Sequence, residues 1–232
     1  MAGIYDIALK KDELSRNLGG GLPNNSIVVL QGNDGAGKSI MCQRLAYGVL
    51  ANGHTATYIS TELDLPSFAL QMRSVGYRVD EFILDEKLLF MPMFPFIGNS
   101  ELQGDFLEKL INTRELFDND VIIFDTLSFF ILNEQINDNN IFRIIQFFKR
   151  LANLDKTIIV SLDPTNVNKR FLSILTSVSD GILTVSLKEF LGNLIRMIEV
   201  VRFRRTLTVP STRIPFRVEP GVGIAIEVAS LS

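Results

Sequence analysis

The stretch Gly32-Asn33-Asp34-Gly35-Ala36-Gly37-Lys38-Ser39 decides the fold of this chain. It satisfies the phosphate-binding loop pattern G-x-x-x-x-G-K-[ST] at every required position. A short β-branched run precedes it (26–31), and a run with helical spacing follows it (38–50), which is the strand–loop–helix context that the motif requires. We therefore expect the glycines to let backbone N–H groups point at phosphate oxygens beside a helix N-terminus.

This loop predicts a set of nucleotide-binding residues. The Lys38 ammonium is expected to reach the β- and γ-phosphates and to assist catalysis, and the Ser39 hydroxyl is expected to ligate Mg²⁺. The whole predicted set is Asn33, Asp34, Gly35, Ala36, Gly37, Lys38, Ser39 and Ile40. The alternative interpretation is a glycine-rich turn that binds no ligand.

Two acidic residues follow predicted strands. Four apolar residues (121–124) precede Asp125, and ligands of α/β sheets bind at such carboxyl ends of strands, so Asp125 is expected to hold Mg²⁺ through a water. Glu62 follows the strand predicted over 55–60 and could orient or deprotonate an attacking water. Alternatively, Glu62 belongs to a capping cluster for the next helix, a role that we assign to Asp64.

Arginines gather near the end of a later strand. Side chains alternate along a strand, so Arg202 and Arg204 are expected on one face and Phe203 on the other. Their guanidinium groups could bind a γ-phosphate of the same chain or of a neighbouring subunit. A solvated face or a nucleic-acid contact is the alternative.

Alternating elements predict one α/β domain over residues 1–232. Strands are expected at 26–31, 55–60, 88–91, 121–124 and 157–162, and helices at 38–50, 65–75, 102–116 and 140–151. Strands interleaved with helices imply a mainly parallel sheet flanked by helices. From residue 182 the pattern is strand-like without helices (182–187, 194–203, 214–218 and 224–228), which predicts an antiparallel extension of the sheet.

Composition excludes several classes of protein. The 232 residues are 47% hydrophobic and 21% charged, with a formal net charge of −3, which argues against a surface devoted to nucleic acid or anionic lipid. One cysteine and one histidine leave no disulfide framework and no Cys- or His-based zinc site. The N-terminal residues lack the apolar core of a signal peptide, and no window approaches 18 uncharged apolar residues, so we expect a cytoplasmic protein.

Several further motifs resemble those of the KaiC-like branch of RecA-superfamily ATPases. The resembling segments are Leu18-Gly19-Gly20-Gly21-Leu22-Pro23, Ser179-Asp180-Gly181-Ile182, the arginine-containing strand Arg196 to Arg204, and Ile214-Pro215-Phe216-Arg217-Val218. The resemblance spans nearly the whole chain and implies a RecA-like P-loop fold with ATP as the nucleotide. It places Glu62 at the catalytic-glutamate position and Arg196, Arg202 and Arg204 on a nucleotide-contacting strand.

Within this branch, the chain is most similar to the ATP-binding accessory proteins of the archaeal flagellar motor. That resemblance implies a ring-forming homo-oligomer at the cytoplasmic face of the membrane, with the motor's secretion-type ATPase and a membrane-associated ring component as partners. Leu63 stands where active relatives often have a second acid, and Leu162-Asp163-Pro164 lacks a γ-phosphate-sensing Gln. We therefore expect ATP to act as an assembly switch with slow or absent hydrolysis.

Three alternatives remain from the sequence. A recombinase of the same superfamily would need basic loops, and the predicted loop 163–171 offers only Lys169 and Arg170. A small-molecule kinase would need an arginine-rich lid, whereas 133–140 is polar and acidic. An interaction module with an empty phosphate loop is the third.

Overall fold

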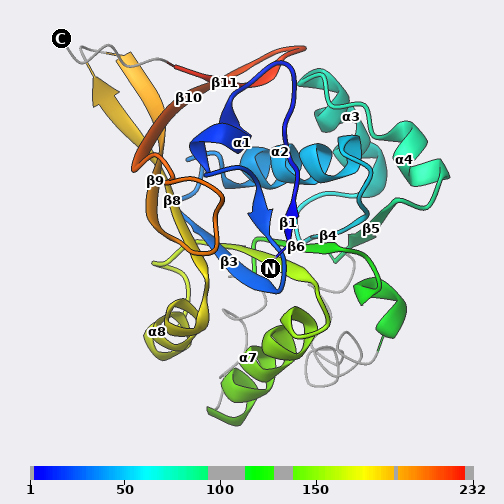
Figure 1. The fold of residues 1–232 in the computed structure, drawn as a ribbon, viewed down its shortest axis with the longest axis vertical. Helices are drawn as coiled ribbons and strands as arrows, with labels where there is room; N and C mark the ends of the chain where they lie inside the picture. Colours follow the sequence, from blue (N-terminus) through cyan, green and yellow to red (C-terminus); the bar gives the residue numbers. More distant parts are fainter. Residues whose placement is uncertain (1–2, 94–112, 128–137, 191–192, 228–232) are drawn as a thin grey trace.

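The computed structural model describes residues 3–93, 113–127, 138–190 and 193–227. Its main sheet has nine described strands in the order β11-β10-β9-β8-β3-β7-β6-β4-β5 (Figure 1). Their bounds are β3 Ser26–Gln31, β4 Ala56–Ser60, β5 Leu88–Pro92, β6 Val121–Asp125, β7 Thr157–Leu162, β8 Gly181–Phe190, β9 Asn193–Phe203, β10 Arg213–Glu219 and β11 Gly223–Ile226. The P-loop strand β3 is central, between β7 and β8.

The sheet has a parallel part and an antiparallel part. From β8 through β3, β7, β6 and β4 to β5 every neighbouring pair is parallel, whereas the pairs β8–β9, β9–β10 and β10–β11 are antiparallel. The predicted parallel sheet with a C-terminal antiparallel extension is therefore confirmed. The parallel strands β3, β6 and β7 are mainly apolar and are buried over nearly their whole length, because helices cover both faces of the sheet.

Two hydrophobic cores lie on the two faces of this sheet. One face packs against α2 (Lys38–Ala51) and α3 (Leu65–Ser74), together with α1 (Leu14–Asn17) and α4 (Asp80–Leu84). The other packs against α7 (Asp138–Ala152) and α8 (Lys169–Val178). Figure 1 shows the two sets of helices on opposite sides of the sheet. A separate two-stranded sheet joins β1 (Ile4–Tyr5) to β2 (Leu22–Pro23).

Most predicted elements agree with the structure to within a few residues, and two points differ. Most of the helix expected at 102–116 falls on residues up to 112, which lie outside the described residues. Near its expected end the chain forms a short 3-10 helix, η2 (Arg114–Phe117). The loop predicted over 163–171 is too long, because α8 already begins at Lys169. The Asn168 side chain caps this helix by accepting hydrogen bonds from the amides of Arg170 and Phe171.

No helix in the described ranges is both long and apolar enough to cross a membrane.

The helix α2 is buried on almost all sides. The outward side is covered by the segment that precedes β3, whose residues Ile7, Leu14 and Leu18 are fully buried. Buried polar side chains on this helix, including Gln43 and Arg44, therefore lie inside the protein. The helix α2, which follows the phosphate-binding loop, is thus held between the sheet and a covering N-terminal segment.

A buried ion pair joins that segment to α2. Arg44 Nε donates to Asp12 Oδ2 at 2.6 Å, and Arg44 Nη2 donates to Asp12 Oδ1 at 2.7 Å and to the Ile7 carbonyl at 3.0 Å. The two side chains are only 0% and 2% exposed. Because both charges are out of water, each needs the other, and removing either leaves an uncompensated buried charge.

We predict that Asp12→Asn lowers the free energy of unfolding by about 3–5 kcal/mol, since it leaves the Arg44 guanidinium buried without its counter-ion. Urea denaturation followed by circular dichroism measures the change. The matched control is Asp80→Asn, which breaks the Arg73–Asp80 pair of the same 2.6 Å length whose side chains are 58% and 47% exposed. That control is expected to cost less than about 1 kcal/mol. Equal costs for the two variants would contradict the prediction.

Candidate nucleotide site

The phosphate-binding loop turns sharply between β3 and α2. At Gly32 a Cβ would stand 2.2 Å from the carbonyl oxygen of Val185 on β8, so only glycine lets the chain pass so close to that strand. Gly37 adopts a φ of +110° and is followed directly by the first residue of α2. The loop therefore wraps around the N-terminus of a buried helix, where backbone N–H groups favour an anion.

The Lys38 ammonium lies within this loop. Its side chain is 6% exposed, and Nζ donates to the Asn33 carbonyl at 3.0 Å and approaches Asp34 Oδ1 at 3.4 Å. The Asp34 side chain is 83% exposed, so this ion pair is accessible to solvent. A phosphate can displace such a weak partner, because exposed pairs contribute little free energy.

Asp125 lies at the end of β6, directly beneath the loop. Asp125 is 4% exposed, and its Oδ1 accepts a hydrogen bond from the Ser39 hydroxyl at 3.1 Å. Ser161 on β7 donates to the same oxygen at 3.1 Å, and the Tyr58 hydroxyl on β4 donates to Oδ2 at 2.7 Å. The two predicted metal ligands, Ser39 and Asp125, are thus in direct contact.

Burial controls the ionisation of this cluster. Desolvation raises the pKa of Asp125 above its usual value, while the hydrogen bonds from Tyr58 and Ser39 oppose the rise by stabilising the carboxylate. Desolvation also raises the pKa of the fully buried Cys42 thiol well above its ordinary value, and the nearby Asp125 adds to the effect. A divalent cation beside Asp125 would lower the pKa of its carboxyl, because a nearby positive charge favours the charged form.

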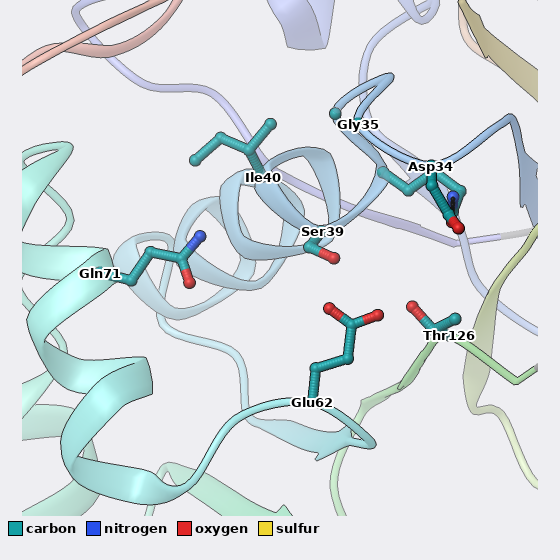
Figure 2. A pocket seen from close by; sticks show the side chains of 9 residues that line it. Asp34, Gly35, Ser39, Ile40, Glu62, Gln71 and Thr126 are labelled. Atoms are coloured by element: carbon teal, nitrogen blue, oxygen red, sulfur yellow. Dashed lines mark hydrogen bonds and ion pairs between the residues drawn. The ribbon is translucent and has the colours of Figure 1, made fainter. Parts of the chain in front are cut away.

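An open cleft of about 310 Å³ lies at the mouth of the loop. It is lined by Asp34, Gly35, Gly37, Lys38, Ser39, Ile40, Glu62, Gln71 and Thr126. Figure 2 shows the Glu62 carboxylate pointing toward Ser39, with Thr126 beside it and Gln71 approaching from α3. The structure thus brings Glu62 to the cleft, while Asp64 caps α3 by accepting a hydrogen bond from the Ser67 amide at 2.8 Å.

The three predicted arginines lie in different places. Arg196 packs against the loop of its own chain, since a Cβ on Gly37 would stand 3.3 Å from Arg196 Cδ. Its buried Nε has no hydrogen-bond partner among the described atoms. Arg202 donates to the Thr176 carbonyl on α8, and Arg204 is exposed beyond the end of β9. Neither Arg202 nor Arg204 lines the cleft of this chain.

The residues present fit a magnesium nucleotide. Magnesium bound to a polyphosphate needs few protein ligands, because phosphate and water oxygens complete its coordination. Ser39 and Asp125 can supply those protein ligands. Gly35 has no described atom within 4 Å of the position that a Cβ would occupy, so the outer part of the loop is open to a ligand. Lys38 and the helix N-terminus supply the positive charge that phosphates require.

Sequence reasoning missed three residues of this site. Gln71 lines the cleft from α3, and Tyr58 and Ser161 bind Asp125 from the strands on either side. Thr126 has a φ of +69°, which is unusual for a β-branched residue, and its amide donates to the Ser161 hydroxyl at 3.1 Å. An apolar strand with one Tyr or Ser is ordinary core sequence, so only the strand order reveals these contacts.

Comparisons with known proteins agree with this geometry. The family model of the KaiC ATPase matches residues 10–230. The archaeal flagellar ATP-binding protein FlaH of Methanocaldococcus jannaschii is 35% identical over 233 residues, covering 99% of this chain and 100% of the relative. The FlaH protein of Methanococcus voltae is 32% identical, covering 97% and 98%.

Solved structures give the same result. The crystal structure of flagellar accessory protein FlaH from Methanocaldococcus jannaschii superposes with a TM-score of 0.89 at 34% identity, covering 98% of this chain and 100% of that one. A KaiC-like protein from Pyrococcus horikoshii has a TM-score of 0.76 at 16% identity, covering 97% and 100%. At that identity the second likeness supports the fold alone.

We predict that Cys42 of the folded protein resists alkylation at pH 8. The thiolate is the reactive form, and each unit by which burial raises the pKa of Cys42 lowers the thiolate fraction about tenfold. Iodoacetamide labelling followed by mass spectrometry measures the rate, and labelling in urea is the control, since Cys42 is the one cysteine in the sequence. Rapid stoichiometric labelling without denaturant would contradict the prediction.

Proposed function

The chain belongs to the KaiC family of ATPases, and on that premise we propose that it is an ATP-binding switch of the archaeal flagellar motor. Residues 1–232 would form a single nucleotide-binding domain with weak or no intrinsic hydrolysis. The observation that supports nucleotide binding best is the 3.1 Å contact between Ser39 and Asp125 behind a complete phosphate-binding loop. The full-length similarity to the FlaH proteins supports the motor assignment.

Each part of the cleft has a role in this proposal. The backbone N–H groups of 33–40 bind the phosphates, and Lys38 leaves Asp34 to contact the β- and γ-phosphates. Ser39 and Asp125 hold Mg²⁺, which when bound neutralises phosphate charge. Arg196 approaches the loop within the same chain, whereas the exposed Arg204 is available to the nucleotide of a neighbouring subunit.

The proposed slow hydrolysis follows from how little acts on the attacking water. Glu62 can orient it, but Leu63 follows in place of a second acid. At the end of β7, Asp163 accepts hydrogen bonds from the Thr165 amide and hydroxyl at 2.8 and 2.7 Å. Among the described residues, none from β7 lines the cleft, so that strand supplies no sensor of the γ-phosphate there.

The cellular role that we propose follows from the resemblance to the accessory proteins of the archaeal flagellar motor. As a subunit of a homo-oligomeric ring, the protein would lie at the cytoplasmic face of the membrane and contact the motor's secretion-type ATPase and a membrane-associated ring component. ATP would favour the assembly-competent state through its differential affinity for that state. Such a switch requires retained nucleotide more than rapid turnover.

We predict that the purified protein retains ATP and releases phosphate from Mg-ATP at less than about 1 s⁻¹, the low end for enzymes. Glu62→Ala should retain ATP and lower any remaining release by about 10²–10⁴-fold, because it removes the candidate base. Lys38→Ala should lose ATP retention and serves as the binding control. Fast release by the wild type that disappears in Glu62→Ala would instead identify a working ATPase, and a single-stranded DNA gel shift would then test recombination.

The switch also predicts a pattern of motility in an archaeon that lacks its own copy of this protein. Wild type and Glu62→Ala are expected to restore swimming, because both bind ATP. Lys38→Ala is expected to restore none, although it is expressed. Swimming zones on soft agar and protein levels on blots measure this. Loss of swimming with Glu62→Ala would show that hydrolysis is needed, and swimming with Lys38→Ala would contradict the switch.

A further inference from the structure

The Asp125 carboxylate is bound from both neighbouring strands. Tyr58 is fully buried on β4, and its hydroxyl donates to Asp125 Oδ2 at 2.7 Å. Ser161 is fully buried on β7 and donates to Asp125 Oδ1 at 3.1 Å. Since β6 lies between β7 and β4, these two residues form a clamp across three adjacent strands, which we call the Tyr58–Ser161 clamp.

The two oxygens of the Asp125 carboxylate have different partners. Oδ2 is occupied by the Tyr58 hydroxyl, whereas Oδ1 accepts from both Ser161 and Ser39. Ser39 lines the cleft, so Oδ1 is the Asp125 oxygen that is hydrogen-bonded to a cleft residue. A carboxylate bound in this way cannot rotate about its terminal torsion without breaking at least one buried hydrogen bond, and breaking such a bond is costly.

Each half of the clamp is held by further contacts. The Tyr58 ring packs against Phe68 of α3 at a centroid distance of 4.8 Å and against Phe90 of β5 at 6.1 Å. The Ser161 hydroxyl also accepts the Thr126 amide at 3.1 Å, so it holds the left-handed residue that follows Asp125 and lines the cleft. The donors therefore have little freedom of their own.

We infer that Tyr58 and Ser161 are positioning residues that set the affinity of this site for a divalent cation. By holding Asp125, they present Oδ1 beside Ser39 in advance, so the cation does not have to order the carboxylate. Outer partners of this kind typically change metal affinity by 10–100-fold when removed. The inference rests on the proposed function, since the cation is expected to bind together with a nucleotide.

Tyr58→Phe tests the first half of the clamp with the smallest change, because it removes one oxygen and keeps the packed ring. Binding of a fluorescent ATP analogue is measured against Mg²⁺ concentration and in EDTA, with an Mn²⁺ titration followed by electron paramagnetic resonance. We expect the Mg²⁺ half-saturation concentration to rise about 10–100-fold, and binding in EDTA to be unchanged. The Mn²⁺ titration should show a parallel loss of affinity.

Two further variants make the test specific. Tyr47→Phe removes a phenol hydroxyl from the same hydrophobic core, where the Tyr47 ring stacks on Tyr77 at 4.9 Å, and is expected to leave the Mg²⁺ dependence unchanged. Ser161→Ala keeps the Tyr58 hydrogen bond and is expected to raise the Mg²⁺ half-saturation concentration. It also provides the test if Tyr58→Phe does not fold.

The outcomes separate the inference from the proposed function. Absence of Mg²⁺-dependent nucleotide binding by the wild type would overturn the proposed function itself. Normal wild-type binding with unchanged Mg²⁺ dependence in folded Tyr58→Phe or in Ser161→Ala would overturn the clamp alone. Equal losses in EDTA and in Mg²⁺ would show a purely structural role and would also overturn it.

Discussion

The site depends on one constraint, the burial of the Asp125 carboxylate between the central sheet and α2. Removing a carboxylate from water is costly unless hydrogen bonds or a counter-charge replace the lost solvation. Here three hydroxyls from β4, β7 and α2 provide the hydrogen bonds. The order of the strands, the packing of α2 and the covering N-terminal segment all serve to place those donors around a single acid.

The parts of the fold that the sequence predicts well are those in which local pattern and burial agree. The runs Ser26–Gln31 and Thr157–Leu162 are short, β-branched and apolar, and both are buried parallel strands. The helix α8 was not predicted, since its capping residue Asn168 follows a polar stretch that is typical of a loop. The burial of the outer side of α2 is not predictable from its own sequence, because residues far from it along the chain, such as Ile7, cover that side.

The same distinction applies to the site. Ser39, Glu62 and Asp125 were predictable because each stands at a recognisable position, either in a motif or at the end of a strand. Tyr58 and Gln71 have no such signal, since one is an ordinary tyrosine in a strand and the other a polar residue within a helix. Their proximity to the cleft follows from strand order and helix packing, which local patterns do not determine.

The C-terminal end of α3 connects the cleft to the β10–β11 edge of the main sheet. The Ser74 carbonyl, at the end of α3, accepts the Gly221 amide at 2.8 Å, and Lys11 Nζ donates to the Gly221 carbonyl at 3.0 Å. The Ile224 amide donates to the Tyr77 hydroxyl at 2.9 Å. The helix α3 therefore lines the cleft at Gln71 and is hydrogen-bonded to the β10–β11 turn at Ser74, three residues later. A displacement of α3 would therefore act on the β10–β11 turn directly, through the Ser74–Gly221 hydrogen bond.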